Sequence, residues 1–167
     1  MDYITRIPSP LGKILLASDG AALIGLWFEG QMHEGYRLSP APAEAEVPVF
    51  REARRWLEQY LNGAVPDFTP PLAPRGSSFQ LRVWSLLRDI PYGQTLTYGD
   101  LARQLSCPSA RAVGGAVGKN PISLMIPCHR VLGAGGRLTG YAGGLLRKEA
   151  LLRLEGILPA GEQEGRP

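Results

Sequence analysis

The sequence predicts an α+β protein, in which a small N-terminal domain of antiparallel β-sheet and helix precedes a mostly α-helical C-terminal domain with a helix-turn-helix. Three observations support this fold class. Short β-prone runs fill the first 28 residues, helical spacing of apolar residues prevails from residue 49 onward, and a proline-rich segment at 67–75 separates the two parts. We therefore expect an N-terminal domain with its linker over 1–74, a C-terminal domain over 75–156 and a disordered tail over 157–167.

The N-terminal part should form a β-meander and one helix. Its β-prone runs are 3–6, 13–18 and 22–28. Turn residues that include Gly12 and Gly20 separate these runs at the spacing of hairpins. The segment 38–48 is rich in Pro, Ala and Glu and should be a surface loop. The stretch 49–61 then carries apolar residues at helical spacing and ends at Asn62-Gly63, which is a helix stop signal.

Four helices are expected in the C-terminal part. Ser77 or Ser78 can cap the first helix. Thr97 can cap a short helix over 98–105, and another helix should follow over 109–118. The tight connection between these two makes them a helix-turn-helix candidate. The last helix, 145–154, is expected to bury one apolar face with Leu146, Ala150, Leu151 and Leu154.

The helix expected over 109–118 has little side-chain bulk. It is built mainly from Ala, Val and Gly, although a glycine costs a helix about 1 kcal/mol relative to alanine. Two explanations fit this composition. Either another helix of the protein packs tightly against it, or an external partner approaches its backbone closely.

Charge is distributed unevenly along the chain. The net charge is +3, but residues 1–74 hold 6 basic and 9 acidic residues, whereas residues 75–155 hold 11 basic and 4 acidic residues. This asymmetry is typical of a polyanion-binding half joined to an acidic one, and a basic face that serves only solubility is the alternative. The sequence has neither a secretory signal nor an apolar run near the roughly 20 residues that cross a bilayer, so we expect a cytoplasmic protein without membrane partners.

Cys128 is the strongest candidate for a reactive group. The only other cysteine is Cys107, and neither lies in a cluster with zinc-ligand spacing, so we expect no metal and no cofactor. The apolar run 122–126 predicts that Cys128 ends a mostly buried strand or extended segment, where a thiol is commonly inert. The adjacent His129 favours a nucleophile instead, because a thiolate needs a proton acceptor. By residue type, Glu155 is a candidate to orient that imidazole.

Four segments together resemble the O6-alkylguanine-DNA alkyltransferase family. They are RAVGGA at 111–116, GKNP at 118–121, PCHRV at 127–131 and GYAGG at 140–144. The resemblance covers residues 77–156 strongly and the N-terminal half only in its general layout. It implies direct-reversal DNA repair, in which a helix-turn-helix engages the minor groove of double-stranded DNA and O6-alkylguanine is flipped out of the stack. Cys128 would then accept the alkyl group irreversibly, in a single turnover.

The resemblance also implies roles for individual residues. His129, oriented by Glu155, would remove the thiol proton through a water, and Asn120 would brace the loop that carries Cys128. Tyr98 would help to rotate the nucleotide and would donate a hydrogen bond to the guanine. The DNA-binding set is Tyr98, Ala112, Gly115 and Arg111, the last filling the gap left by the flipped base. The substrate pocket set is Ser123, Met125, Tyr141 and Ala142.

Two pocket positions depart from some relatives. Ala142 stands where others carry Ser, which removes a hydroxyl contact to the guanine oxygen but keeps the backbone donor. Ser123 stands where others carry Pro, which leaves the width of the alkyl pocket open.

Three alternative functions have distinct signatures. A non-catalytic lesion sensor of the same fold replaces the cysteine, so the presence of Cys128 argues for transfer. A cysteine hydrolase needs sulfur and imidazole face to face, which adjacent residues rarely provide. A transcription regulator is expected to show polar base-reading side chains on the second helix, where this chain has Ala, Val and Gly. We expect a monomer, with cooperative assembly on DNA left open.

Overall fold

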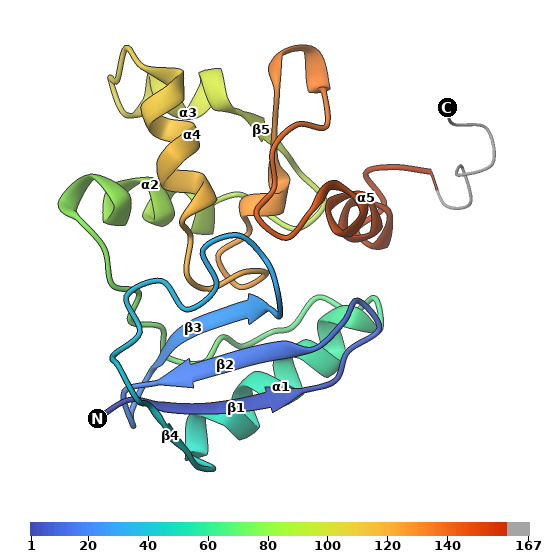
Figure 1. Ribbon diagram of the computed structural model, residues 1–167. Helices are drawn as coiled ribbons and strands as arrows, with labels where there is room; N and C mark the ends of the chain where they lie inside the picture. The colour runs from blue at the N-terminus through green and yellow to red at the C-terminus, as the bar shows by residue number, and fades with distance from the viewer. Residues whose placement is uncertain (160–167) are drawn as a thin grey trace.

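The computed structural model describes residues 1–159, which form a lower half built on a β-sheet and an upper half built mainly from helices (Figure 1). The α+β fold class predicted from the sequence is confirmed. Most of the segment expected to be a disordered tail, residues 160–167, lies outside the described residues.

The sheet has the strand order β3-β2-β1-β4. Strands β1 (Tyr3–Ile7), β2 (Ile14–Ser18) and β3 (Leu23–Phe28) form the predicted antiparallel meander. Strand β4 (Ala43–Glu44) lies parallel to β1, within the segment predicted to be a surface loop. The loop prediction is wrong for these two residues because the edge of β1 offers backbone groups to pair with, and the N–H of residue 43 donates to the carbonyl of Asp2 at 2.9 Å.

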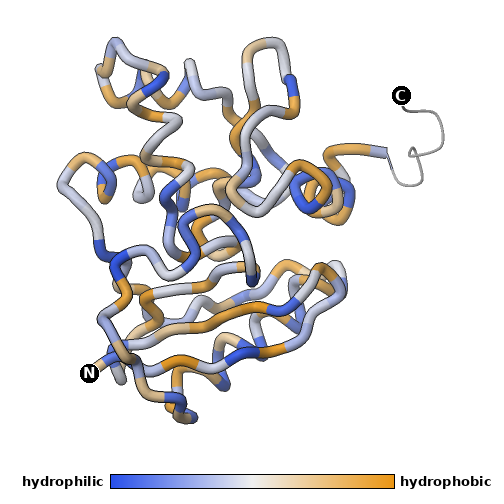
Figure 2. The backbone as a smooth tube through the Cα atoms, viewed as in Figure 1, coloured by the Kyte–Doolittle hydropathy of each residue, from blue (hydrophilic) through white to orange (hydrophobic). Residues whose placement is uncertain are grey.

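Helix α1 (Pro48–Leu61) packs against the sheet (Figure 1). Its first residue is a proline, which suits a first turn because the missing N–H would have no partner within the helix. The apolar residues of α1 join those of β2 and β3 in the main core, and a smaller cluster around Trp27 lies apart from it. Figure 2 shows hydrophobic residues along the strands and the facing helix.

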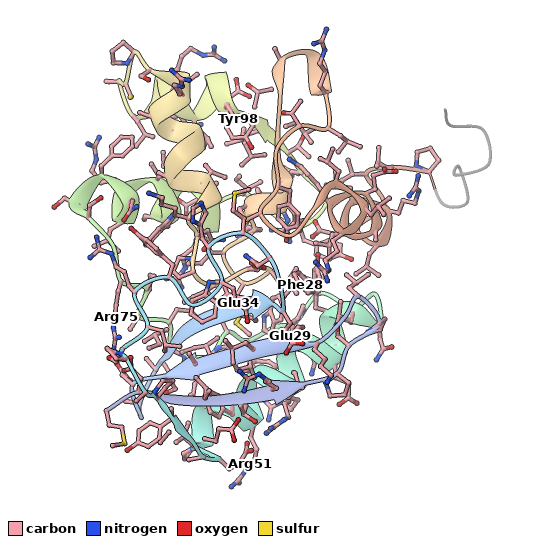
Figure 3. All side chains as sticks on the ribbon, in the orientation of Figure 1. Phe28, Glu29, Glu34, Arg51, Arg75 and Tyr98 are labelled. Carbon is pink, nitrogen blue, oxygen red and sulfur yellow. The ribbon has the colours of Figure 1, made fainter. Side chains whose placement is uncertain are left out.

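The proline-rich segment 67–75 is bonded to the sheet along part of its length. The N–H of Leu23 donates to the carbonyl of Pro71, and the N–H of Ala73 donates to the carbonyl of Leu23, both at 2.8 Å. Arg75, labelled at the left edge of Figure 3, donates from two nitrogens to the carboxylate of Asp2 at 2.8 and 2.9 Å. The connection between the two halves is therefore fixed to the lower half.

The helices of the upper half begin at side-chain caps. Ser77 caps α2 (Ser78–Arg88) and Thr97 caps α3 (Tyr98–Gln104), each in a capping box with the residue three positions later. Ser109 caps α4 (Ala110–Gly118), which packs on α3 as a helix-turn-helix. Helix α4 also packs on α2, where the indole N–H of Trp84 donates to the carbonyl of Ala116 at 2.8 Å.

The upper half also contains two short strands and two 3₁₀ turns. Strand β5 (Leu96–Thr97) pairs in parallel with β6 (Val131–Leu132), and the 3₁₀ turns are η1 (Cys128–Arg130) and η2 (Ala134–Gly136). These connections place the start of α3 beside the segment that follows Cys128. They are local elements that the sequence pattern did not predict.

Helix α5 (Leu145–Leu154) has the predicted bounds, but its buried face agrees only in part with the predicted one. Leu146, predicted to be in the core, is 83% exposed. The buried positions are Lys148, Leu151 and Leu152. Leu151 is buried as predicted, and Leu154 packs against the core. The prediction was wrong for Leu146 because it omitted Lys148, whose ammonium group has acceptors inside the protein.

One hydrophobic core extends through both halves. The same cluster contains Leu26 of the sheet, Trp84 of α2 and Ile122 in the turn before Cys128. Backbone hydrogen bonds cross the boundary at the same place: the N–H of Leu26 donates to the carbonyl of Pro121 at 2.8 Å, and the N–H of Ser123 donates back to the carbonyl of Leu26 at 2.9 Å. The segment that leads to Cys128 is therefore supported by the sheet.

Candidate active site

Cys128 begins the 3₁₀ turn η1 and does not end a strand. The extended conformation predicted for residues 122–126 is wrong, because these residues form a tight buried turn in which the N–H of Ile126 donates to the carbonyl of Ile122 at 3.0 Å. Asn120 holds this turn from within. Its Nδ2 donates to the carbonyl of Ile126 at 2.7 Å, and its Oδ1 accepts from the N–H of Ile122 at 3.0 Å.

The thiol of Cys128 is shielded from solvent, with 5% of the residue exposed. Burial raises the pKa of this thiol, and the nearby Asn120 side chain and Lys148 charge lower it only in part. The resting group is therefore a thiol. A nearby proton acceptor is needed before the sulfur can act as a strong nucleophile.

His129 and Glu155 form a fully buried pair in which Nε2 lies 2.7 Å from Oε2. The same carboxylate accepts hydrogen bonds from Nε and Nη2 of Arg130 at 2.8 and 3.0 Å and from the N–H of Gly93 at 2.9 Å. The hydroxyl of Tyr60, which comes from α1 in the lower half, donates to Oε2 at 2.5 Å. Five donors thus converge on one carboxylate.

These contacts set the charge state of the pair. Burial alone would raise the pKa of Glu155, but hydrogen bonds from His129 and Arg130 outweigh it and lower that pKa to about 2. Burial lowers the pKa of His129, and the attraction of Glu155 offsets this only in part. A carboxylate therefore faces a neutral imidazole at neutral pH. The Nδ1 atom of His129 is buried and has no hydrogen-bond partner within residues 1–159.

A cavity of about 450 Å³ opens beside Cys128. Its walls are Tyr98 at the start of α3, one side of α4, the loop that contains Tyr141 and Ala142, and Met32 from the turn after β3. Figure 3 shows Tyr98 in the upper half of the molecule, close to α4. The Tyr98 hydroxyl donates to the carbonyl of Gly140 at 3.2 Å, and burial raises its pKa, so it remains a donor.

Two of the predicted pocket residues lie outside the cavity lining. Ser123 and Met125 are buried, with 2% and 7% exposed, in the turn that precedes Cys128. The backbone of Ser123 is bonded to Leu26 of the sheet, which holds the residue on the side of the lower half. Both residues therefore support the turn that carries Cys128, whereas Tyr141 and Ala142 line the cavity.

The outer face of α4 consists of small exposed residues and one cation. Arg111, Ala112 and Gly115 are exposed, whereas Val113 and Ala116 face the core. A Cβ atom added at Gly115 or at Gly118 would meet nothing within 4 Å. Packing within the protein therefore does not require glycine at these two positions, which favours close approach by an external partner over tight helix packing.

Three residues of this region were missed in the sequence. Tyr60 and Met32 come from the N-terminal half, and no local spacing relates them to Cys128. Lys148 is fully buried and donates to the carbonyls of Val131, Thr139 and Gly140 at 2.5, 2.9 and 3.3 Å. The available signal for Lys148 was its spacing of three and four residues from Leu151 and Leu152, which places a lysine on the apolar side of a helix.

In the part of the chain that the structure describes, no three His, Cys, Asp or Glu side chains gather closely enough to hold a metal ion. Within the same residues, no helix is long and apolar enough to cross a membrane.

Comparisons with known proteins match both halves of the chain. Residues 3–74 match the family model described as "6-O-methylguanine DNA methyltransferase, ribonuclease-like domain", and residues 78–157 match the "DNA binding domain" of the same name. Proteins named methylated-DNA–protein-cysteine methyltransferase from Haemophilus influenzae and Methanosarcina acetivorans are each 47% identical, over 93% and 92% of this chain and 87% and 98% of their own lengths. A crystal structure of Mycobacterium tuberculosis OGT in complex with DNA is 42% identical, with a TM-score of 0.83 over 95% of this chain and 96% of that one.

Proposed function

The chain belongs to the 6-O-methylguanine DNA methyltransferase family, and from that premise we propose that Cys128 is the acceptor that this protein uses to repair alkylated DNA. The protein is a methylated-DNA–protein-cysteine methyltransferase that removes the alkyl group of O6-alkylguanine by direct transfer. The resemblance found in four sequence motifs is thus confirmed at the level of the family. The observation that carries the assignment of Cys128 is its place in the wall of the cavity, next in the chain to His129, whose imidazole is paired with Glu155.

The proposed reaction is a displacement at the alkyl carbon. The proton of Cys128 passes through a bridging water to Nδ1 of His129, while Glu155 holds the imidazole and stabilises its charged form. The sulfur then forms a bond to the alkyl carbon as the bond from that carbon to O6 of guanine breaks. Hydrogen bonds from Tyr98 and from the backbone N–H groups near Tyr141 and Ala142 stabilise the leaving guanine anion. The guanine then takes up one proton, which balances the proton that Cys128 gave up to His129. The products are a thioether on Cys128 and an unmodified guanine.

Double-stranded DNA is the partner, and the exposed face of α4 is proposed to enter its minor groove. The small residues Ala112 and Gly115 allow the helix backbone to approach the sugars closely, and Arg111 would occupy the space left by the flipped base. Extrusion of a base costs a few kcal/mol and costs least where pairing is already weak, which favours lesions. We further propose that the protein acts in the cytoplasm and as a monomer.

A thioether is not hydrolysed under mild conditions, so each molecule should react once. The test is to incubate the protein with duplex DNA that contains O6-methylguanine and to record the intact protein mass. We expect one added methyl group per molecule, located on Cys128 by peptide mapping and absent from Cys128→Ser. Cys107→Ser is the matched control and should accept the methyl group normally.

A non-catalytic lesion sensor is the alternative, and it gives a different result in the same experiment. A sensor would bind the lesion duplex tightly while its mass stayed unchanged. Turnover beyond one equivalent would contradict the single-use mechanism.

A further inference from the structure

We propose that Tyr60, a residue of the N-terminal helix α1, is a positioning residue of the transfer reaction: its hydroxyl fixes the tautomer of His129 so that Nδ1 is the proton acceptor. The inference rests on the proposed transfer to Cys128 and extends it. Tyr60 lies 69 residues from His129 and 95 residues from Glu155, yet its hydroxyl contacts both, at 3.2 Å from Nε2 and 2.5 Å from Oε2.

The hydrogen-bond inventory determines how these three groups share their protons. A phenol has one proton, and an ionised carboxylate only accepts. The Tyr60 hydroxyl therefore donates to Glu155, and its oxygen is left as an acceptor beside Nε2 of His129. If Nε2 carried no proton, its lone pair would face two oxygens that are also electron-rich. The proton of neutral His129 thus belongs on Nε2, shared between Glu155 and Tyr60, and the lone pair belongs on Nδ1.

The position of Tyr60 is itself tightly constrained. The residue is fully buried in the last turns of α1. Its ring stacks on Trp56 with centroids 5.1 Å apart and meets the edge of Tyr92 at 6.1 Å. Burial and the charge of Glu155 raise the pKa of Tyr60, so the hydroxyl keeps its proton across the range in which the protein works. The rigid ring therefore presents one fixed donor to the carboxylate.

Loss of this hydroxyl should change the basicity of His129 in a known direction. The charged and titratable groups around the imidazole are Tyr60, Arg130, Lys148 and Glu155, together with Cys128, its neighbour in the chain. Of these groups, only Glu155 attracts a proton on His129. The hydrogen bond from Tyr60 withdraws part of the negative charge of the Glu155 carboxylate. Without the hydroxyl, Glu155 acts more fully on His129 and raises its pKa. The neutral acceptor form is then populated only at higher pH.

The experiment compares Tyr60→Phe with the wild-type protein in single-turnover methyl transfer at saturating O6-methylguanine duplex, across pH. We expect the first-order rate constant of the variant to fall about tenfold, because a hydrogen bond to a charged group is lost, while the Kd for the duplex stays unchanged. The acid limb of its pH profile should move upward by about half a unit. Tyr92→Phe is the matched control and should behave as wild type, since within residues 1–159 its hydroxyl donates to the carbonyl of Leu154, at 3.4 Å, and not to Glu155.

A wild-type rate and pH profile in Tyr60→Phe overturn the proposal, and so does an equal loss in both tyrosine variants, which would indicate packing alone. Should Tyr60→Phe fail to fold, ¹⁵N NMR of the wild-type imidazoles decides the matter, with His33→Gln used to assign the two histidine signals. A protonated Nε2 with bare Nδ1 supports the proposal, and the opposite tautomer contradicts it. Absence of any methyl transfer by the wild-type protein refutes the proposed function instead, and the tautomer measurement then tests the role of Tyr60 independently.

Discussion

Glu155 is a buried carboxylate that the folded protein keeps ionised. Its pKa in the folded state, about 2, lies below the ordinary value of 4.5. The folded state therefore binds fewer protons than the unfolded state within this interval, so the contribution of Glu155 to stability is complete above pH 4.5 and is lost as the pH falls to about 2.

We expect Glu155→Gln to lower the free energy of unfolding by about 3 kcal/mol at pH 7, because Arg130 is left without its charged partner. The difference from wild type should shrink as the pH falls from 4.5 toward 2. Urea unfolding at a series of pH values measures both effects. Asp67→Asn, at an exposed carboxylate, serves as the control and should change little. A deficit that does not vary with pH would show that Glu155 acts through packing.

The sequence identified the reactive neighbourhood because its members lie close together in one motif-rich stretch. Cys128, His129 and Asn120 are within nine positions of one another, and Glu155 follows as the carboxylate at the end of the last helix. Tyr60 had no such signal, since its contact with Glu155 depends on how two distant helices pack. The burial of Lys148 was not predicted either, because lysine side chains are usually exposed to solvent. The roles of the contacting residues remain predictions until the variants are measured.

Helix α4 combines poor helix-forming residues with an open outer face. Gly115 is exposed, and a Cβ atom there would meet no atom of residues 1–159 within 4 Å. We therefore expect Gly115→Ala to raise the free energy of unfolding, by up to about 1 kcal/mol, and at the same time to weaken binding to lesion duplex. Thermal unfolding and a fluorescence binding titration measure the two quantities.

Ser85→Ala, on the exposed face of α2, is the control for helix propensity alone and should raise stability without changing the affinity for DNA. If Gly115→Ala strengthens or preserves DNA binding, the outer face of α4 does not lie against the groove.

Element types were easier to predict than the faces they bury. Capping signals at Ser77 or Ser78 and at Thr97 located two helix starts correctly, because the side-chain oxygens of Ser77 and Thr97 bond to backbone groups only three residues away. The turn at 122–126 was mistaken for an extended segment because its residues are mostly apolar and their conformation is imposed by Asn120 and the sheet. These conformations depend on tertiary contacts, which produce no periodic pattern in the sequence.

The two halves match separate family models, yet they share one hydrophobic core. Leu26, Trp84 and Ile122 belong to the same cluster, and backbone hydrogen bonds join β3 to the turn before Cys128. Because neither half buries its apolar surface alone, we expect a single cooperative unfolding transition. Differential scanning calorimetry should give equal calorimetric and van't Hoff enthalpies. Two resolved transitions would contradict a shared core.

The hydroxyl of Tyr60 ends on a carboxylate that belongs to the other half of the chain. Suppose that residues 1–74 were exchanged for the corresponding domain of another protein. Every residue of the motif around Cys128 would be preserved, but the hydrogen bond to Glu155 would be lost unless the new domain carried a tyrosine at the position of Tyr60. The halves are therefore not interchangeable parts in evolution or in protein engineering. The contact between the two halves has to be inherited together with the motif around Cys128.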